Sequence, residues 1–234
     1  MTRALGVARR KVAPALAADV VAMAAACDEA VRQAERDPDA RPGEVLRRRR
    51  DKALMLVGFA AALRRSELAG LQRENLSFTP DGLRVRVARS KSDQEGAGQV
   101  VGVAYGERAE TCPVRALRSY LGAASSALDV QGRPSPLSGP VFRKVDRWGR
   151  LGAKAITGRA VANVVKHYAA AAGLNPALYS GHSLRAGFAT TAARAGKPDR
   201  AIQKQTRHKS TAMLAEYVRE GELFDDNASE GIGL

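Results

Sequence analysis

An uninterrupted apolar segment, Ala53–Leu63, constrains the fold of this chain most strongly, because so many apolar side chains must be buried. Its eleven residues fall well short of the roughly 20 that a membrane-spanning helix needs. At this length and composition the segment is typical of a buried helix in a globular core. The basic run Arg47–Arg50 leads into it. We therefore expect a globular core that contains this helix, and no membrane span.

The length and composition favour one domain with short flanking segments. The chain has 234 residues, of which 45% are hydrophobic and 26% charged, which excludes collagen-like and largely disordered chains. Residues 1–13 carry basic side chains without a hydrophobic period and are predicted to be a linker. Residues 14–224 are predicted to form the domain, and residues 225–234 a loosely attached tail.

The charge is strongly unbalanced. Lys and Arg number 38 against 24 Asp and Glu, which gives a formal net charge of +14. An excess of this size in one domain is the expected electrostatic footprint of a nucleic-acid-binding protein. An acidic membrane surface and an acidic protein are the alternative partners that charge alone leaves open.

Cysteine and histidine usage argues against a disulfide framework and against a metal site. The chain has two cysteines, Cys27 and Cys112, and three histidines, none of them in a spacing typical of zinc ligands. Asp19 and Asp28 interrupt the apolar stretch near the N-terminus, so a secretory signal peptide is not predicted. We expect a reducing, cytoplasmic setting and no cofactor, since the sequence also lacks a GxxxxGK[ST] phosphate loop.

Hydrophobic periodicity predicts an α+β fold that is mainly helical, with a small antiparallel sheet. Leu83–Val87 alternates apolar and basic residues, and Val100–Val103 is a second β-branched run, so the two should form a hairpin or a small sheet. Thr157 is a candidate N-cap and Gly173 a candidate C-cap of one helix. Helices are predicted over residues 14–34, 53–63, 113–121, 157–172, 183–195, 198–206 and 210–218, and loops over residues 37–43 and 131–140.

Several short segments carry candidate chemistry, and each has an ordinary structural alternative. Arg64 follows the buried helix, where positive charge is favoured at a helix C-terminus in any case. Lys91 lies in the predicted hairpin and could be an ordinary surface lysine. His182 and Arg185 are three residues apart at a predicted helix start, so an imidazole and a guanidinium could share an oxyanion such as phosphate.

A second histidine lies nine residues before a tyrosine. His208 and Tyr217 span a predicted turn and helix. A buried tyrosine with a satisfied hydroxyl is the structural alternative for Tyr217.

Read in order, these segments resemble the active-site series of the tyrosine recombinases, the phage-integrase family. AALRRSEL is similar to the first arginine box of the family, and RSKSDQEG to its hairpin with the lysine. GHSLRAGFAT resembles the His-x-x-Arg box, and TRHKSTAMLAEY the closing box with its nine-residue interval from histidine to tyrosine. The resemblance covers roughly residues 44–224. It implies a recombinase catalytic domain with catalytic Arg64, Lys91, His182, Arg185, His208 and Tyr217.

Two features depart from the family pattern. Arg207 stands directly before His208, where members usually carry glycine. Members also normally have an N-terminal helical domain that clamps the other face of the DNA, whereas this chain begins near the interdomain linker. The resemblance therefore predicts either a catalytic fragment or a truncated reading frame.

The resemblance implies a metal-independent mechanism. Tyr217 would attack the scissile phosphate of double-stranded DNA and form a 3′-phosphotyrosyl link, with His182 as its base. Arg64 and Arg185 would stabilise the charge on the phosphate, Lys91 would protonate the leaving 5′-oxygen, and His208 would add a hydrogen bond. Glu67 is expected to support the arginine turn. Members act as tetramers on paired DNA sites, and a monomer is expected without DNA.

Three other functions remain open at this point. A type IB topoisomerase would use the same chemistry to relax DNA. A non-catalytic DNA-binding remnant of a mobile element would keep only the affinity. A basic scaffold that binds RNA is disfavoured because the sequence has no RNP-like aromatic motif and its aromatic content is only 5%.

Overall fold

A computed structural model describes residues 12–87, 98–135, 138–208 and Ala215. Its helices are α1 (Ala17–Arg36), α2 (Gly43–Ala60), α3 (Arg65–Ala69), α4 (Pro113–Ser125), α5 (Gly158–Ala171), α6 (Ser183–Arg194) and α7 (Asp199–Thr206). Two short 3-10 helices are η1 (Arg73–Asn75) and η2 (Pro176–Leu178). The strands are β1 (Leu76–Thr79), β2 (Gly82–Val87), β3 (Gln99–Ala104), β4 (Arg143–Val145) and β5 (Leu151–Ala155). The predicted class, mainly helical with a small antiparallel sheet, is confirmed.

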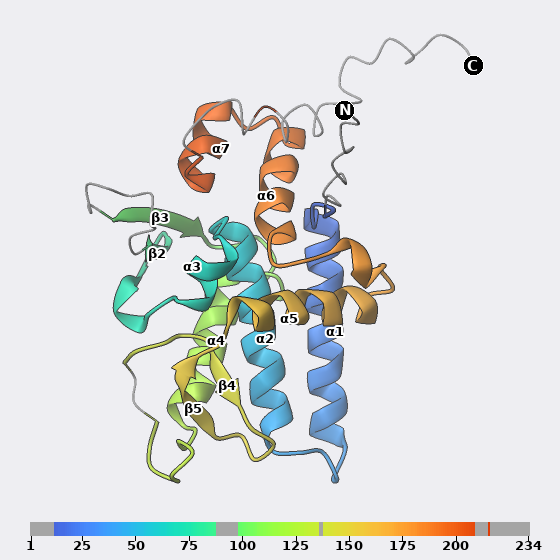
Figure 1. Cartoon of the computed structure of the whole chain (residues 1–234), viewed down its shortest axis with the longest axis vertical. Helices are drawn as coiled ribbons and strands as arrows, with labels where there is room; N and C mark the ends of the chain where they lie inside the picture. Colours follow the sequence, from blue (N-terminus) through green and yellow to red (C-terminus); the bar gives the residue numbers. More distant parts are fainter. Residues whose placement is uncertain (1–11, 88–97, 136–137, 209–214, 216–234) are drawn as a thin grey trace, which may run out of the picture.

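The apolar segment forms the second half of α2, the central helix of the core. Residues 53–57 are all buried, and α2 packs against α1, α4 and α6. Figure 1 shows α1 and α2 side by side, with α5 crossing them and with α6 and α7 beyond one end. The helix starts at Gly43, ten residues before the predicted boundary, and ends at Ala60. The prediction was too short because the Arg-rich first half buries only one side, which includes Leu46, Arg50 and Asp51.

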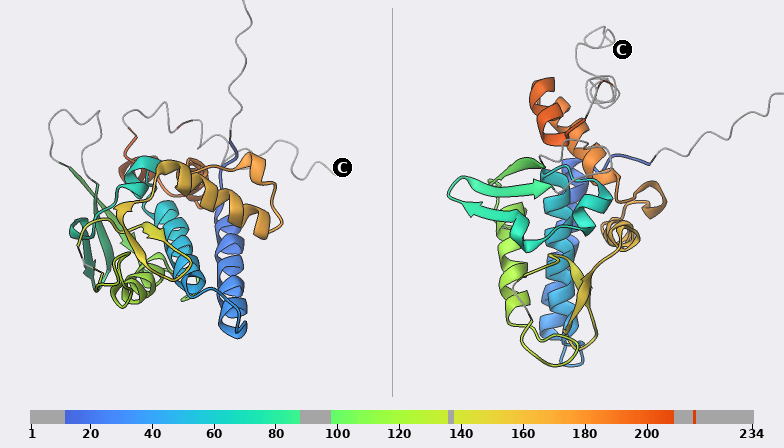
Figure 2. Two further views of the ribbon diagram at one scale, coloured as in Figure 1. Left: turned by 60° about the horizontal axis from the view of Figure 1, so that its bottom comes forward. Right: turned by 60° about the vertical axis from the view of Figure 1, so that its left-hand side comes forward.

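The predicted hairpin is confirmed, and it belongs to a three-stranded sheet. β2 and β3 pair antiparallel with Leu83 opposite Val103 and Val85 opposite Val101, and these four side chains are buried. β1 adds to the other edge of β2 and was not predicted from its four residues. The views in Figure 2 show this sheet to one side of the helices. It therefore brings the start of β3 toward the site described below.

A second sheet, of the two short strands β4 and β5, was also missed. The three residues of β4 include Arg143, which is buried and donates from Nη2 to Ser135 Oγ at 2.6 Å. The backbone oxygen of Arg143 accepts from Arg50 Nη1 at 3.0 Å. A buried arginine hides the alternating pattern that marks a strand in a sequence.

The C-terminal helices begin close to their predicted positions. Thr157 is the N-cap of α5, since its Oγ1 accepts from the backbone N–H of Ala160 at 3.1 Å. Gly173 follows the helix with a φ of +76°, a left-handed conformation suited to glycine. The predicted helix over residues 210–218 lies outside the described residues apart from Ala215. Among the helices that the structure describes, none is long and apolar enough to cross a membrane.

Candidate active site

The C-terminal end of α2 is the point at which the site is assembled. Ala62 has a φ of +46°, which turns the chain sharply out of the helix toward Arg64. The last carbonyls of a helix have no partners within it and carry partial negative charge. Side chains from two later helices occupy them here. Gln205 Nε2 donates to Ala60 O at 2.7 Å, and Arg185 Nη1 donates to Ala62 O at 2.7 Å.

Arg64 is fixed by the first turn of α3. Glu67 Oε2 accepts from the backbone N–H of Arg64 at 2.8 Å, and Glu67 Oε1 accepts from Arg64 Nη1 at 2.7 Å. The Glu67 side chain is 8% exposed, whereas the Arg64 side chain is 39% exposed. The prediction that Glu67 supports the arginine turn is therefore confirmed. The neighbouring Arg65 points elsewhere, toward the backbone of Gly158 and Gly181.

His182 and Arg185 lie together at the start of α6. His182 is the N-cap residue, and its backbone N–H donates to Ser180 Oγ at 3.2 Å. Arg185 lies in the first turn and is 2% exposed. Its bond to Ala62 O joins α6 to the turn that carries Arg64. The segments that contain Arg64 and Arg185 are therefore joined at the backbone oxygen of Ala62, although they lie more than a hundred residues apart in the sequence.

His208 follows α7 and is buried, with 7% of its surface exposed. Thr206 Oγ1 donates to Ile202 O at 2.8 Å and lies 3.0 Å from His208 Nδ1. This contact fixes the position of the His208 ring, and the tautomer of the imidazole decides which of the two groups donates. Gln203 Nε2 donates to the backbone oxygen of His208 at 3.2 Å and fixes the same turn.

Arg207 closes the site from the side of α7. It adopts a left-handed conformation, with φ 57° and ψ 39°. Its Nη2 donates to Glu67 Oε2 at 2.7 Å, and its guanidinium also donates to Ala61 O at 3.2 Å and to Ala62 O at 3.3 Å. Glu67 thus joins Arg64 to Arg207.

The charges of these groups act on one another. Burial and the nearby charges of Arg185 and Arg64 lower the pKa of His208 to about 4. Burial and the charge of Arg185 also lower the pKa of His182. Both imidazoles are therefore neutral near pH 7 in the free protein. Positive charges that lower the pKa values of neighbouring histidines also favour the binding of an anion between them.

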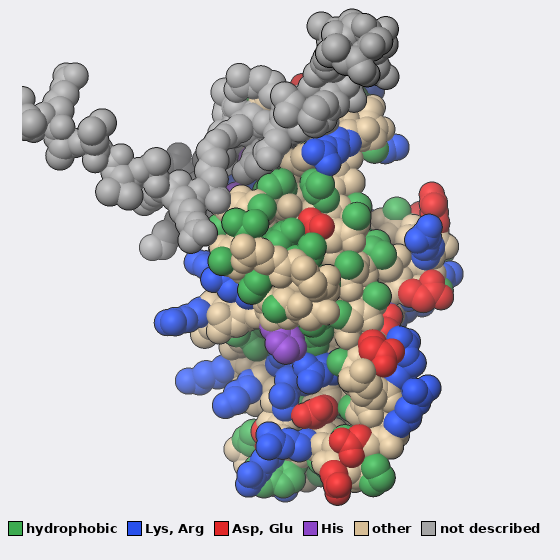
Figure 3. Space-filling model, turned by 90° about the vertical axis from the view of Figure 1, so that its right-hand side faces the viewer, with side chains coloured by type: hydrophobic (Ala, Val, Ile, Leu, Met, Phe, Trp, Pro, Cys, Tyr) green, Lys and Arg blue, Asp and Glu red, His purple; other side chains and the backbone are tan. Residues whose placement is uncertain are grey.

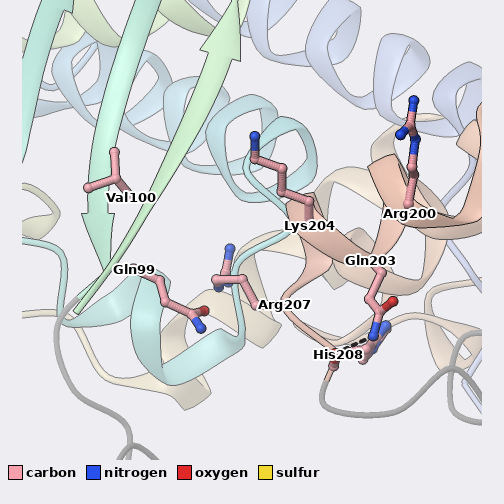
Figure 4. Close-up of a pocket in the computed structure, with 7 residues that line it drawn as sticks. All are labelled: Gln99, Val100, Arg200, Gln203, Lys204, Arg207 and His208. Carbon is pink, nitrogen blue, oxygen red and sulfur yellow. Dashed lines mark hydrogen bonds between the residues drawn. The ribbon is translucent and has the colours of Figure 1, made fainter. Parts of the chain in front are cut away.

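A cavity of about 500 Å³ opens beside His208 and Arg207. Figure 4 shows α7 on one side of it and the start of β3 on the other. The residues that line the cavity are Gln99, Val100, Arg200, Gln203, Lys204, Arg207 and His208. Lys204 and Arg200 add positive charge at its edge, and Gln99 lies two residues after the segment 88–97 that holds Lys91.

The structure thus brings together Arg64, His182, Arg185 and His208. Lys91 and Tyr217 lie outside the described residues. Sequence reasoning noted Arg207 as a departure from the family pattern but missed its contacts, and it assigned no role to Gln205 or Thr206. Gln205, Thr206 and Arg207 lie in or next to the closing box. Their roles are visible only from the contacts that they make with the end of α2, with α3 and within α7. Within the part of the chain that the structure describes, no cluster of His, Cys, Asp or Glu is arranged to hold a metal ion.

Comparison with known proteins identifies the family of the chain. Residues 44–222 match the model of the phage integrase family. An integrase/recombinase XerD homologue of Selenomonas ruminantium is 44% identical over 179 residues, which is 76% of this chain and 50% of that protein. The chain spans about half the length of the curated relatives it matches.

Solved structures agree with the fold. A XerH site-specific recombinase bound to a palindromic difH substrate, in a post-cleavage complex, aligns with a TM-score of 0.62 and 15% identity over 90% of this chain and 50% of that one. A XerA recombinase aligns with a TM-score of 0.60 and 20% identity over 93% of this chain and 62% of that one. Matched over most of its length by the family model, the chain belongs to the phage integrase family.

Proposed function

We propose that this chain is the catalytic domain of a tyrosine site-specific recombinase, which cuts and rejoins double-stranded DNA through a 3′-phosphotyrosyl intermediate. One observation carries the proposal. Arg64, Arg185, His182 and His208 converge at the end of α2, where burial, together with the charge of Arg185, lowers the pKa values of both histidines. Such a centre suits one phosphodiester, and family membership supports the same reaction.

In this mechanism the arginines hold the non-bridging oxygens of the scissile phosphate. Arg64 offers an exposed guanidinium that is anchored by Glu67, and Arg185 a buried one that is anchored by Ala62 O. Donors held in advance stabilise the negative charge that grows in the transition state, at no cost of reorganisation. His208 donates a further hydrogen bond to the same phosphate.

Tyr217 is the proposed nucleophile. Its phenolic oxygen forms a bond to phosphorus and loses its proton to His182, whose lowered pKa keeps the ring neutral and able to accept it. The bond from phosphorus to the 5′-oxygen breaks, and Lys91 supplies the proton that this oxygen takes up. The reverse steps rejoin the strand. Two guanidinium groups and a lysine supply the positive charge, so the mechanism assigns no role to a metal ion or cofactor.

The partner and the assembly follow from the same proposal. The net charge of +14 suits double-stranded DNA. We assign residues 14–224 to the catalytic domain, and the backbone hydrogen bond that Ala15 N–H donates to Ser183 O supports the inclusion of the segment before α1. We expect a monomer without DNA and a tetramer on paired DNA sites. We also expect a cytoplasmic location, where buried, unpaired thiols such as Cys27 and Cys112 persist.

A nicked suicide duplex tests the proposal. Cutting beside the nick releases a short fragment, so the strand cannot be rejoined and a covalent complex accumulates on a denaturing gel. Tyr217→Phe should abolish this complex and leave the DNA affinity nearly unchanged. A complex that persists in the variant would remove Tyr217 as the nucleophile.

The general acid is tested separately. Lys91→Ala should cut a normal duplex slowly but should recover when sulfur replaces the 5′-bridging oxygen, because a thiolate leaves without a proton. Equal losses on both duplexes would show that Lys91 binds the backbone and does not transfer a proton.

A further inference from the structure

Arg207 occupies a backbone conformation that disfavours it. Its φ of 57° and ψ of 39° lie in the left-handed region, which non-glycine residues visit rarely. Family members usually have glycine here, which adopts this conformation without strain. A strained backbone conformation that persists next to a site indicates that the side chain at this position has a function.

The side chain of Arg207 is buried and held on several sides. It is 5% exposed, and it makes an ion pair with Glu67 at 2.7 Å. It also donates to the backbone oxygens of Ala61, Ala62 and Gln205. One guanidinium therefore fixes the end of α7, where His208 follows, against the end of α2, where Arg64 follows.

The charge balance around Glu67 gives Arg207 a second effect. The buried carboxylate of Glu67 faces two guanidinium groups, those of Arg64 and Arg207. The trio carries a net charge of +1, and Arg64 is its exposed member. Without Arg207, Arg64 and Glu67 would form a neutral pair, and the carboxylate would offset the charge that Arg64 presents to an anion.

We propose that Arg207 is a positioning residue for the DNA cleavage described above. It neutralises Glu67, so that Arg64 keeps its positive charge for the scissile phosphate, and it locks the His208 turn onto the end of α2. This inference rests on the proposed function. Glycine at this position would relieve the backbone strain, but it would neither neutralise Glu67 nor hold the His208 turn against the end of α2.

The central test measures the rate at which the covalent complex forms in a single turnover on the suicide duplex. Arg207→Gly should lower this rate about tenfold to a hundredfold, a range typical of coupling within one ion-pair network, and should change DNA affinity much less. Arg36→Ala removes the same charge from the exposed end of α1 and should leave the rate unchanged.

Rescue separates charge balance from a merely structural role. The double variant Glu67→Gln with Arg207→Gly removes both buried charges, so Arg64 again carries an uncompensated charge and the rate should recover about tenfold. A double variant no faster than Arg207→Gly, or an Arg207→Gly variant as fast as the wild type, would overturn the proposal.

Folding defects are controlled by a second pair of variants. Arg207→Lys keeps the buried charge and Arg207→Gln removes it, and both keep the backbone strain. If Arg207→Gly melts below the assay temperature, the Lys variant should cut about tenfold faster than the Gln variant. Equal rates would contradict the charge balance.

A wild type that forms no covalent complex would refute the proposed function and not this inference. In that case inorganic phosphate is titrated into the protein while the Nε–Hε NMR signal of Arg64 is followed. Phosphate should shift this signal in the wild type and bind about tenfold more weakly to Arg207→Gly. Equal affinity in the two proteins would overturn the role of Arg207.

Discussion

At the scale of single residues, Arg64 and Arg185 share one proposed task in very different surroundings. Arg185 is almost fully buried and satisfies the carbonyl of Ala62, whereas the Arg64 side chain is 39% exposed. Arg185 is thus part of both the fold and the site, while Arg64 belongs mainly to the site.

Replacing each arginine by alanine should separate these roles. Both variants should lose about 10²–10³ in cleavage rate, as expected for a lost transition-state donor. Arg185→Ala should also lower the free energy of unfolding by about 1–3 kcal/mol, because it leaves the oxygen of Ala62 with a weaker partner. Arg64→Ala should lower it less. Urea unfolding of the two variants beside the wild type measures the difference, and equal destabilisation would contradict the structural assignment.

His208 makes stability depend on pH. Its pKa is about 4 in the folded protein against 6.5 for an unperturbed histidine. The unfolded chain therefore binds the proton more tightly, and stability is full above pH 6.5 and declines as the pH falls toward 4. Between about pH 7.5 and about pH 4.5 the free energy of unfolding should fall by about 2–3 kcal/mol from this group.

A variant isolates this contribution. His208→Gln cannot take up the proton, so its free energy of unfolding should fall less over the same interval, by the share that His208 supplies. Denaturant unfolding at several pH values gives both slopes. Parallel slopes in the two proteins would show that His208 is not held neutral.

Local motifs in the sequence identified the candidate site residues, and the limit of such motifs is visible at Arg207. The motifs place Arg64, His182, Arg185 and His208 because each lies in a short segment with its own spacing. The role of Arg207 depends on Glu67, 140 residues earlier, and on the left-handed backbone of its own turn. A single sequence contains neither piece of information, so the same residue stood out only as a departure from glycine.

At the scale of elements, the prediction succeeded where patterns are long and failed where strands are short. The N-cap of α5 and the pairing of β2 with β3 follow from residue type and alternation alone. β1 and β4 have four and three residues, too few for an alternating pattern to be recognised. Such strands form because neighbouring strands and helices cover them.

Two glycines in different helices provide a matched test of the packing. In α6, a Cβ at Gly187 would overlap the backbone oxygen of Ala15, which lies across this helix. In α4, Gly122 is exposed and has open space around its Cβ position. Gly187→Ala should therefore destabilise the protein by about 1–3 kcal/mol through overpacking. Gly122→Ala should stabilise it by about 0.5–1 kcal/mol through helix propensity.

Thermal melting of the two variants decides the point. A stabilised Gly187→Ala protein would mean that the segment before α1 does not pack on α6 as described. An unchanged Gly122→Ala protein would contradict the open position of that residue.

At the scale of the whole molecule, the distribution of charge over the surface matters more for DNA binding than the net charge does. On the face shown in Figure 3, Asp and Glu side chains lie among Lys and Arg along one margin, and apolar side chains fill the area beside them. Ion pairs such as Lys52 with Asp28 and Arg49 with Glu35 join α1 and α2. Around His208 the cavity is lined by Arg200, Lys204 and Arg207.

This distribution predicts the salt dependence of DNA binding. Each phosphate contact releases counterions, so log K should fall against log salt concentration with a slope of about −0.9 for each contact. Lys204→Ala should make this negative slope less steep by about 0.9, whereas Arg36→Ala should not change it. Fluorescence anisotropy between about 50 mM and about 200 mM salt measures both. Identical slopes for Lys204→Ala and wild type would place the DNA away from this cavity.

The covalent intermediate is the central claim, and the polarity of its bond tests it most directly. A suicide duplex is labelled on either side of the scissile phosphate, and the trapped complex is digested and analysed by mass spectrometry. We predict that the strand ending at the 3′-phosphate stays on the protein, joined to the peptide that contains Tyr217, while the other strand leaves with a free 5′-hydroxyl. A linkage to the 5′-side of the break, or to a different residue, would contradict it.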